Sequence, residues 1–135
     1  MGFQVFLNGT LVTDSGEIPN GLLIARDGRI EYAGRRDGVE LPPQAERIDA
    51  DGRYIAPGFV DIHVHGGGGS DFMDATDTDI DQAIRYHLTH GTTALCPTTA
   101  TAPLNEILAA LDALDRYRSR GAPLARALGA HIEIE

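Results

Sequence analysis

The second half of the chain alternates between strand-like apolar stretches and stretches with helical spacing. The strand patterns cover residues 57–65, 92–96 and 127–133, and the helical patterns cover residues 78–90 and 103–120. Parallel neighbouring strands need a long crossover, usually a helix, so this order predicts a β-α-β-α-β unit with a parallel sheet. A whole (β/α)₈ barrel needs about 250 residues, so we expect a partial barrel, and a chain that is a piece of a longer protein or a truncated product.

Both helical stretches carry an apolar stripe. The first stripe comprises Ile80, Ala83, Ile84 and Leu88; the second comprises Leu104, Ile107, Leu108, Leu111 and Leu114. Residues at these spacings share one helix face, which we expect to pack against the sheet. Gly91 and Gly121 stand where the two helices would end.

Residues 1–56 are typical of a β scaffold. Short strand patterns cover residues 3–7, 10–12, 22–25, 29–33 and 53–55. The dipeptides Asn8-Gly9, Asp27-Gly28 and Asp51-Gly52 favour tight turns, because both residues of such a pair tolerate positive φ. We find no candidate for chemistry in this segment.

Composition excludes several classes of partner. The chain of 135 residues has 20 acidic and 11 basic residues, giving a net charge of −9, which argues against binding to nucleic acid or anionic membranes. No stretch approaches the ~20 apolar residues of a membrane span, and the start lacks the pattern of a signal peptide. Cys96 is the only cysteine, so no internal disulfide is possible. We expect a cytoplasmic protein.

The first candidate site is a pair of histidines, His63 and His65, at the carboxyl end of the strand pattern. Side chains of alternate strand residues share a face, so Asp61, His63 and His65 point to one side. Imidazole is the commonest metal ligand, and active sites of parallel barrels lie at the carboxyl ends of strands. The spacing therefore predicts half of a metal site, although two structural histidines would give the same pattern.

A second polar pair, His131 and Glu133, ends the third strand pattern. Both side chains would share a face, and a carboxylate there could complete a metal site with the two imidazoles. Glu133 could equally be a solvated residue near the chain end. His131 could occupy a deeper layer or contact a substrate.

Other motifs favour structural roles. The run Gly66–Gly69 lacks the features of a phosphate-binding loop, and we interpret it as a place where backbone approaches a substrate or metal closely, or as a flexible loop. Asp77, Asp79 and Asp81 have part of a calcium-loop spacing, but helix capping explains them better. His87, His90 and Cys96 fit structural positions.

Three stretches resemble one enzyme family. Residues 55–73, Ile-Ala-Pro-Gly-Phe-Val-Asp-Ile-His-Val-His-Gly-Gly-Gly-Gly-Ser-Asp-Phe-Met, resemble the first barrel strand of the amidohydrolase superfamily. His90-Gly91-Thr92-Thr93 with Cys96-Pro97-Thr98, and the stretch 128–133, narrow the resemblance to the N-acetylglucosamine-6-phosphate deacetylases. The resemblance covers nearly the whole chain but only about the first third of a family enzyme. It implies that residues 1–56 belong to a small β-sandwich domain and residues 57–135 to the first three strands and two helices of the barrel.

The resemblance also implies a site and an activity. His63, His65 and Glu133 match metal ligands of the family, which holds one or two divalent ions, zinc or iron. The implied reaction is hydrolysis of N-acetylglucosamine 6-phosphate to glucosamine 6-phosphate and acetate. The aspartate that acts as general acid and base is expected beyond residue 135, so the chain contains no catalytic residue and we expect it to be inactive alone. The family's glutamate is followed by Gly-Pro, whereas Ile134-Glu135 follow here. We expect the full-length form to be a homo-oligomer.

Two alternatives stay open on the sequence. The first is an amidohydrolase that acts on another C–N bond, such as that of a cyclic amide. The second is a noncatalytic module with a vestigial site that acts through association. Three parallel strands leave an open sheet edge and uncovered apolar surface, so we expect the isolated chain to aggregate or oligomerise.

Overall fold

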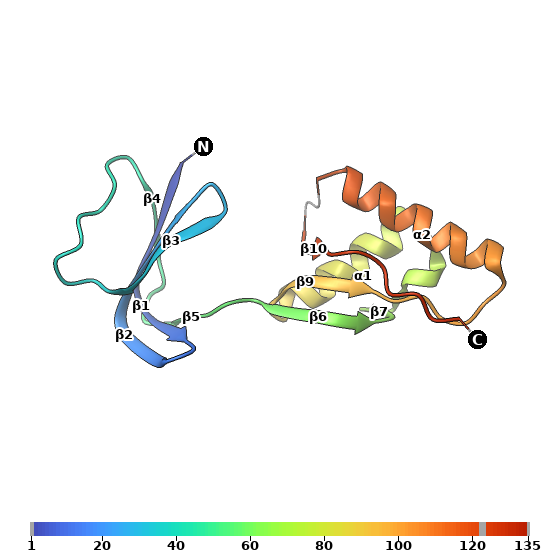
Figure 1. The fold of residues 1–135 in the computed structure, drawn as a ribbon, viewed down its shortest axis with the longest axis horizontal. Helices are drawn as coiled ribbons and strands as arrows, with labels where there is room; N and C mark the ends of the chain where they lie inside the picture. The colour runs from blue at the N-terminus through green and yellow to red at the C-terminus, as the bar shows by residue number, and fades with distance from the viewer. Residues whose placement is uncertain (1, 122–123, 135) are drawn as a thin grey trace. The chain divides into compact units, whose positions relative to one another are not determined.

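The computed structural model describes residues 2–121 and 124–134, which form two compact units (Figure 1). The amino-terminal unit extends to Pro57 and the carboxyl-terminal unit starts at Gly58. Each unit has its own buried apolar cluster. The predicted mixture of strands and helices is confirmed, whereas the assignment of the two units to a β-sandwich and a barrel stays a prediction.

The amino-terminal unit is a single β-sheet. Its strands are β1 (Phe3–Thr13), β2 (Gly16–Arg26), β3 (Arg29–Arg35), β4 (Glu46–Asp49) and β5 (Tyr54–Ile55). The order is β3-β2-β1-β4, and β5 also pairs with β1. Val5 and Leu7 of β1 pack with Leu22 and Ile24 of β2 in the core. Alternate residues of β1 are buried because one face of the strand covers this cluster.

Two turn predictions had different outcomes. Asp27-Gly28 makes the turn between β2 and β3, as predicted. The prediction for Asn8-Gly9 was wrong, because both residues lie inside one continuous β1. Asn8 has a positive φ of 57°, and the pairing with β2 shifts register there, so the dipeptide forms a bulge instead of a turn. A side chain at Gly9 would meet Ala50 at 2.7 Å, which explains the glycine.

The carboxyl-terminal unit contains a parallel sheet. Strands β6 (Phe59–Val64), β9 (Thr92–Pro97) and β10 (Arg126–Ala127) have the order β10-β9-β6, with β9 in the middle. Helices α1 (Asp77–Thr89) and α2 (Leu104–Ser119) connect them. Both neighbours of β9 run parallel to it, as the β-α-β-α-β order predicts. That this sheet forms part of a barrel stays a prediction.

The third strand is much shorter than the expected span of residues 127–133. A regular ladder covers only Arg126 and Ala127, and a single bridge then joins His131 to Thr98. From Ala127 to His131 there are four residue steps, whereas only three separate Leu95 from Thr98. The additional residue interrupts the ladder, in the manner of a bulge.

The two helices pack on the sheet through different kinds of face. Helix α1 buries the predicted Ile80, Ala83 and Ile84. Helix α2 follows the expected stripe only in part, because Leu104 and Leu108 are 70% and 51% exposed. Its buried residues are Ile107, Ala110, Ala113, Leu114 and Tyr117. Ile107 and Leu114 were part of the predicted stripe, whereas Ala110, Ala113 and Tyr117 were not.

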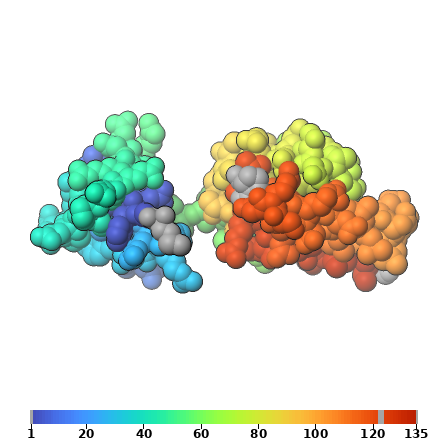
Figure 2. All heavy atoms as spheres, turned by 90° about the horizontal axis from the view of Figure 1, so that it is seen from above, coloured from blue at the N-terminus to red at the C-terminus, as the bar shows by residue number. Residues whose placement is uncertain are grey.

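The aspartates at the start of α1 follow a threonine cap, and two of them pair with α2. The Thr76 hydroxyl accepts a hydrogen bond from the backbone N–H of Asp79 and thereby caps the helix. Asp77 pairs with Arg116 at 3.0 Å, and Asp81 pairs with Arg120 at 2.8 Å. In Figure 2 the atoms of α2 (orange) lie against those of α1 (yellow-green). These contacts support the structural interpretation of the aspartates over a calcium loop.

The run Gly66–Gly69 forms a small hairpin directly after the histidine pair. Strand β7 (Gly66–Gly67) pairs with β8 (Ser70–Asp71), and the short 3₁₀ helix η1 (Phe72–Asp74) follows. Gly68 and Gly69 have φ values of 63° and 92°, which glycine adopts without strain. A Cβ at Gly66 would lie 2.2 Å from the carbonyl oxygen of Ser70. The glycines therefore accommodate the chain's own backbone in a hairpin instead of a plain loop. A close approach of this backbone to a substrate or metal stays a prediction.

Strand β6 is an edge of its sheet and exposes apolar side chains. Phe59, Val60 and Ile62 are 69%, 59% and 73% exposed.

Within residues 2–121 and 124–134, no helix combines the length and the apolar character needed to cross a membrane.

Replacing Tyr117 by Phe is expected to destabilise the chain and to alter its response to alkali. The Tyr117 hydroxyl is buried and donates a hydrogen bond to the carbonyl oxygen of Ala125 at 2.6 Å. Its loss should lower the free energy of unfolding by about 1–2 kcal/mol, measured by urea denaturation at pH 7. Burial also raises the pKa of Tyr117 above its usual 10.0. The stability due to this raised pKa is complete below pH 10 and is lost as the pH rises through the folded-state pKa.

Between pH 9 and pH 11 the free energy of unfolding should therefore fall more for the wild-type chain than for Tyr117→Phe. The difference in free energy of unfolding between the two proteins should narrow over this range. Tyr86→Phe, at a 46% exposed position, is the matched control and should have little effect. Parallel stability curves for wild type and Tyr117→Phe across this pH range would contradict the prediction.

Replacing Gly66 by Ala is expected to disrupt the hairpin that follows the histidines. The new methyl group would overlap the Ser70 carbonyl, and a backbone atom cannot move away without distorting the pairing of β7 with β8. We expect a loss of about 2–3 kcal/mol in the free energy of unfolding, measured by urea denaturation.

Gly129→Ala is the matched control for this change, because a Cβ there has no neighbour within 4 Å among the described residues. It should change stability by less than about 0.5 kcal/mol. Equal effects of the two substitutions would show that the hairpin does not require glycine at position 66.

Candidate metal centre

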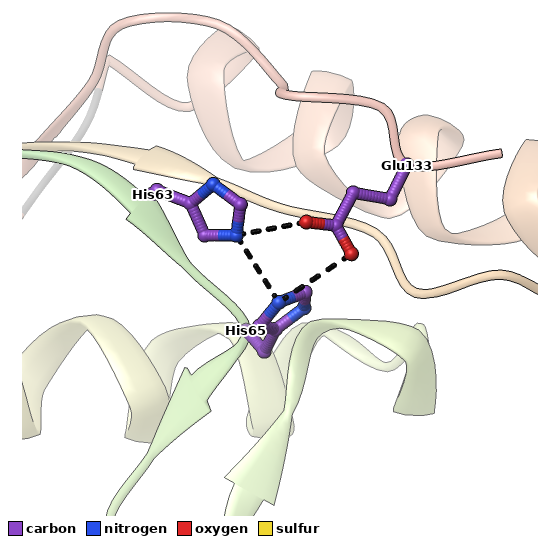
Figure 3. Close-up of side chains that lie close together, drawn as sticks. All are labelled: His63, His65 and Glu133. Atoms are coloured by element: carbon purple, nitrogen blue, oxygen red, sulfur yellow. Dashed lines mark hydrogen bonds and ion pairs between the residues drawn. The ribbon is translucent and has the colours of Figure 1, made fainter.

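Three of the side chains singled out in the sequence come together at one end of the parallel sheet. His63 lies on β6, His65 follows that strand, and Glu133 lies on the segment after β10. One ligand atom from each lies within 4.8 Å of the others. Figure 3 shows the two imidazoles and the carboxylate pointing toward one another.

The carboxylate of Glu133 contacts both imidazoles. Oε1 lies 2.9 Å from Nε2 of His63, and Oε2 lies 3.8 Å from Nε2 of His65. The two Nε2 atoms are 3.3 Å apart. The three side chains are 41–44% exposed, so the group opens to solvent.

The donor set fits a divalent cation. Ligand atoms at 2.0–2.1 Å from a tetrahedral zinc ion lie about 3.3–3.4 Å from one another, close to the separation of the imidazole nitrogens. Two imidazoles and a carboxylate also suit iron. The exposed side of the group leaves room for a further ligand. That these three residues bind a metal stays a prediction.

Backbone pairing explains why residues distant in sequence meet here. The N–H of Thr98, just beyond β9, donates to the carbonyl of Val64 at 2.8 Å. The next N–H, that of Thr99, donates in the opposite direction to the carbonyl of His131 at 3.0 Å. The chain beyond β9 therefore pairs on one side with β6, the strand that carries His63, and on the other side with the segment that carries Glu133.

The pairing of β6 with β9 is irregular. Asp61 pairs with Leu95 and Val64 with Pro97, so two residues of β6 lie opposite one residue of β9. The carboxylate of Asp61 accepts a hydrogen bond from the backbone N–H of His63 at 3.1 Å. Asp61 thus supports the local backbone, and it is outside the donor group despite the spacing it shares with the histidines.

The other histidines lie outside the donor group. The His131 ring packs edge-on against that of His63, with 4.6 Å between centroids and 88° between planes. Nε2 of His87 donates to the carbonyl of Gly66 at 2.9 Å, and Nδ1 of His90 donates to that of Tyr86 at 2.8 Å. Cys96 is partly buried on β9. These contacts support the structural interpretation of His87 and His90.

Two residues near the site were not recognised from the sequence. Thr98 and Thr99 are fully buried, and their hydroxyls contact Val64 and Glu133 respectively. The signal in the sequence was a pair of hydroxyl residues immediately after an apolar strand. Their partners depend on the register of pairing, which the sequence does not specify.

The chain is similar to curated deacetylases over most of its length. It is 33% identical over 123 residues to an N-acetylgalactosamine-6-phosphate deacetylase of Escherichia coli O157:H7, covering 91% of the chain and 31% of the relative. It is 43% identical over 104 residues to an N-acetylglucosamine-6-phosphate deacetylase of Vibrio furnissii, covering 76% of the chain and 24% of the relative. A dihydroorotase of Anaeromyxobacter sp. (strain K) is 34% identical over 129 residues, covering 93% and 28%. The chain thus spans less than a third of the length of these relatives.

Solved structures agree with these similarities. The N-acetyl-D-glucosamine-6-phosphate deacetylase of Mycobacterium smegmatis matches with a TM-score of 0.72 and 30% identity, covering 98% of this chain and 35% of that one. The corresponding Pasteurella multocida enzyme has the same fold over 96% of this chain and 34% of its own, with a TM-score of 0.80 and 24% identity.

The comparison with family models gave no match. Most of the relatives described above, and the Mycobacterium smegmatis structure, are amino-sugar-phosphate deacetylases. The chain is therefore a homologue of the N-acetylglucosamine-6-phosphate deacetylases within the amidohydrolase superfamily, with the extent of an amino-terminal portion of such a protein.

Proposed function

We propose that this chain is the amino-terminal part of a metal-dependent amidohydrolase that converts N-acetylglucosamine 6-phosphate to glucosamine 6-phosphate and acetate. The observation that carries the proposal is the convergence of His63, His65 and Glu133 within 4.8 Å, in a chain similar to deacetylases of this kind. An isolated ion pair would require only one imidazole. The second imidazole and the approach of the two nitrogens support a shared cation.

His63, His65 and Glu133 would hold a divalent cation, zinc or iron, as one ion or as one of two. When bound, such an ion lowers the pKa of a coordinated water and polarises the acetamide carbonyl of the substrate. The neutral imidazoles would offer lone pairs at Nε2, so their protons would lie at Nδ1. The Glu133 carboxylate would contribute the negative charge that partly balances the cation.

Hydrolysis also needs a group that moves protons between the attacking water and the departing amine. Asp61 lies outside the donor group, and its carboxylate accepts the N–H of His63. We propose that the general acid and base is an aspartate on a later strand of the whole protein. The described chain would accordingly be inactive alone, with residues 1–56 contributing to a small β-sandwich and residues 57–135 beginning a (β/α)₈ barrel. We further propose that the whole protein is a cytoplasmic homo-oligomer.

A second candidate is hydrolysis of a cyclic amide. The similarity to a dihydroorotase covers 93% of the chain, and the same three donors would serve ring opening of a dihydroorotate-like substrate. A cation held by His63, His65 and Glu133 would supply the same polarisation to either amide, so the residues of this chain do not separate the two reactions. The number of deacetylases among the relatives favours the sugar phosphate.

The metal site predicts a selective loss of binding in variants of its donors. His63→Ala and Glu133→Gln should each weaken Zn²⁺ binding at least about 10-fold, since the first removes an imidazole and the second replaces a carboxylate with a neutral amide. Competition with a chromophoric chelator measures the affinity at pH 7.5. His90→Ala is the matched control, because this imidazole contacts the Tyr86 carbonyl and not the donor group. Binding that is unchanged in both donor variants would contradict the site.

The proposed reaction is tested by acetate release from the whole protein that contains this chain. After loading with Zn²⁺ or Fe²⁺, it should release acetate from N-acetylglucosamine 6-phosphate, and Glu133→Gln should reduce kcat/KM at least about 100-fold. Parallel assays with N-acetylgalactosamine 6-phosphate and dihydroorotate compare the alternatives. Turnover of dihydroorotate alone would support the second candidate, and no turnover of any substrate would contradict both.

A further inference from the structure

We propose that Thr98 and Thr99 are positioning residues whose side-chain hydroxyls fix the separation of the three metal donors. The inference rests on the proposed metal site but concerns residues outside the donor group. The two threonines follow β9, between β6 and the segment that carries Glu133. Each hydroxyl contacts one of these two neighbours.

Thr98 fixes the backbone between the two histidines. Its Oγ1 accepts a hydrogen bond from the N–H of Val64 at 3.0 Å and donates one to the carbonyl of Cys96 at 3.1 Å. The N–H of Thr98 also donates to the carbonyl of Val64 at 2.8 Å. Both polar groups of the Val64 backbone are therefore held by one residue, directly after the irregular pairing between Asp61 and Val64.

Thr99 holds the backbone of Glu133 through its side-chain hydroxyl. Its Oγ1 accepts a hydrogen bond from the N–H of Glu133 at 3.1 Å and donates to the carbonyl of the same residue at 3.5 Å. Residues 132–134 belong to no strand, and the last bridge of the sheet is the one at His131. The Thr99 hydroxyl thus extends the attachment of this segment two residues further, to the residue that bears the carboxylate.

The hydroxyls are needed here because both threonines are completely buried. Thr98 and Thr99 have no exposed surface, and among the described residues no buried side-chain polar atom is without a partner. Valine has nearly the same shape but cannot accept the N–H groups of Val64 and Glu133. Its introduction would remove these two bonds and so loosen the donor-bearing segments, although Val64 and His131 would keep their backbone bonds to residues 98 and 99.

A small shift matters because the donors lie at distances that a single ion could bridge. Nε2 of His63 is 3.3 Å from Nε2 of His65 and 2.9 Å from Oε1 of Glu133. The first distance depends on the backbone at Val64, and the second on the backbone at Glu133. Residues that orient metal ligands from outside the coordination sphere commonly change metal affinity 10–100-fold when they are replaced.

Thr98→Val and Thr99→Val test the inference in the full chain. Zn²⁺ affinity is measured by competition, and the visible spectrum of bound Co²⁺ reports the geometry of the donors. We expect each variant to bind Zn²⁺ about 10-fold more weakly and to alter the Co²⁺ spectrum. Thr99→Ser, which keeps the hydroxyl, should restore both properties. Thr92→Val, a buried position at the other end of β9, is the matched control and should resemble wild type.

Wild-type affinity and an unchanged Co²⁺ spectrum in both valine variants would overturn the inference while leaving the metal site intact. Failure of the wild-type chain to bind metal would instead contradict the proposed function. In that case amide hydrogen exchange of the metal-free wild-type chain tests whether the two threonine hydroxyls hold the backbone of Val64 and Glu133. The amides of Val64 and Glu133 should be protected, and exchange at Glu133 at the rate of an unstructured peptide would overturn it, whether or not the valine variants fold.

Discussion

The pairing of β9 with a neighbour on each side is the interaction on which the carboxyl-terminal unit depends. Leu95 in the middle of this strand is completely buried in the core cluster, where it joins residues of α1 and α2. Backbone bonds from the end of the same strand then reach Val64 on one side and His131 on the other. Core packing and assembly of the donor group therefore rely on a single strand.

This arrangement gives the buried threonines a role that packing alone would not require. Regular ladders hold neighbouring strands by repeated backbone bonds, but both ladders beside β9 are irregular near the donors. Side-chain hydroxyls of Thr98 and Thr99 supply bonds in these places. We infer that these hydroxyls limit the freedom that irregular pairing would otherwise introduce near the donors.

Much of this organisation could be predicted from the sequence, because periodic apolar residues identify elements and their order. The helix over α1 followed from such patterns. The grouping of Glu133 with His63 and His65 stayed open on spacing alone and was implied by the family resemblance. The inner face of α2 followed only in part. Ile107 and Leu114 are buried as predicted, whereas Ala110 and Ala113 carry a weak apolar signal beside leucines that remain exposed. The bulge at Asn8 and the short third strand depend on register, which only the folded sheet determines.

The most direct test of the central claim is X-ray absorption spectroscopy of the zinc-loaded chain at the metal edge. The account predicts a first shell of nitrogen and oxygen ligands at about 2.0–2.2 Å from zinc, together with the multiple scattering of two imidazole rings. Replacing His63 or His65 should remove part of this imidazole scattering. A shell of water oxygens without imidazole scattering, or a sulfur from Cys96 at about 2.3 Å, would contradict it.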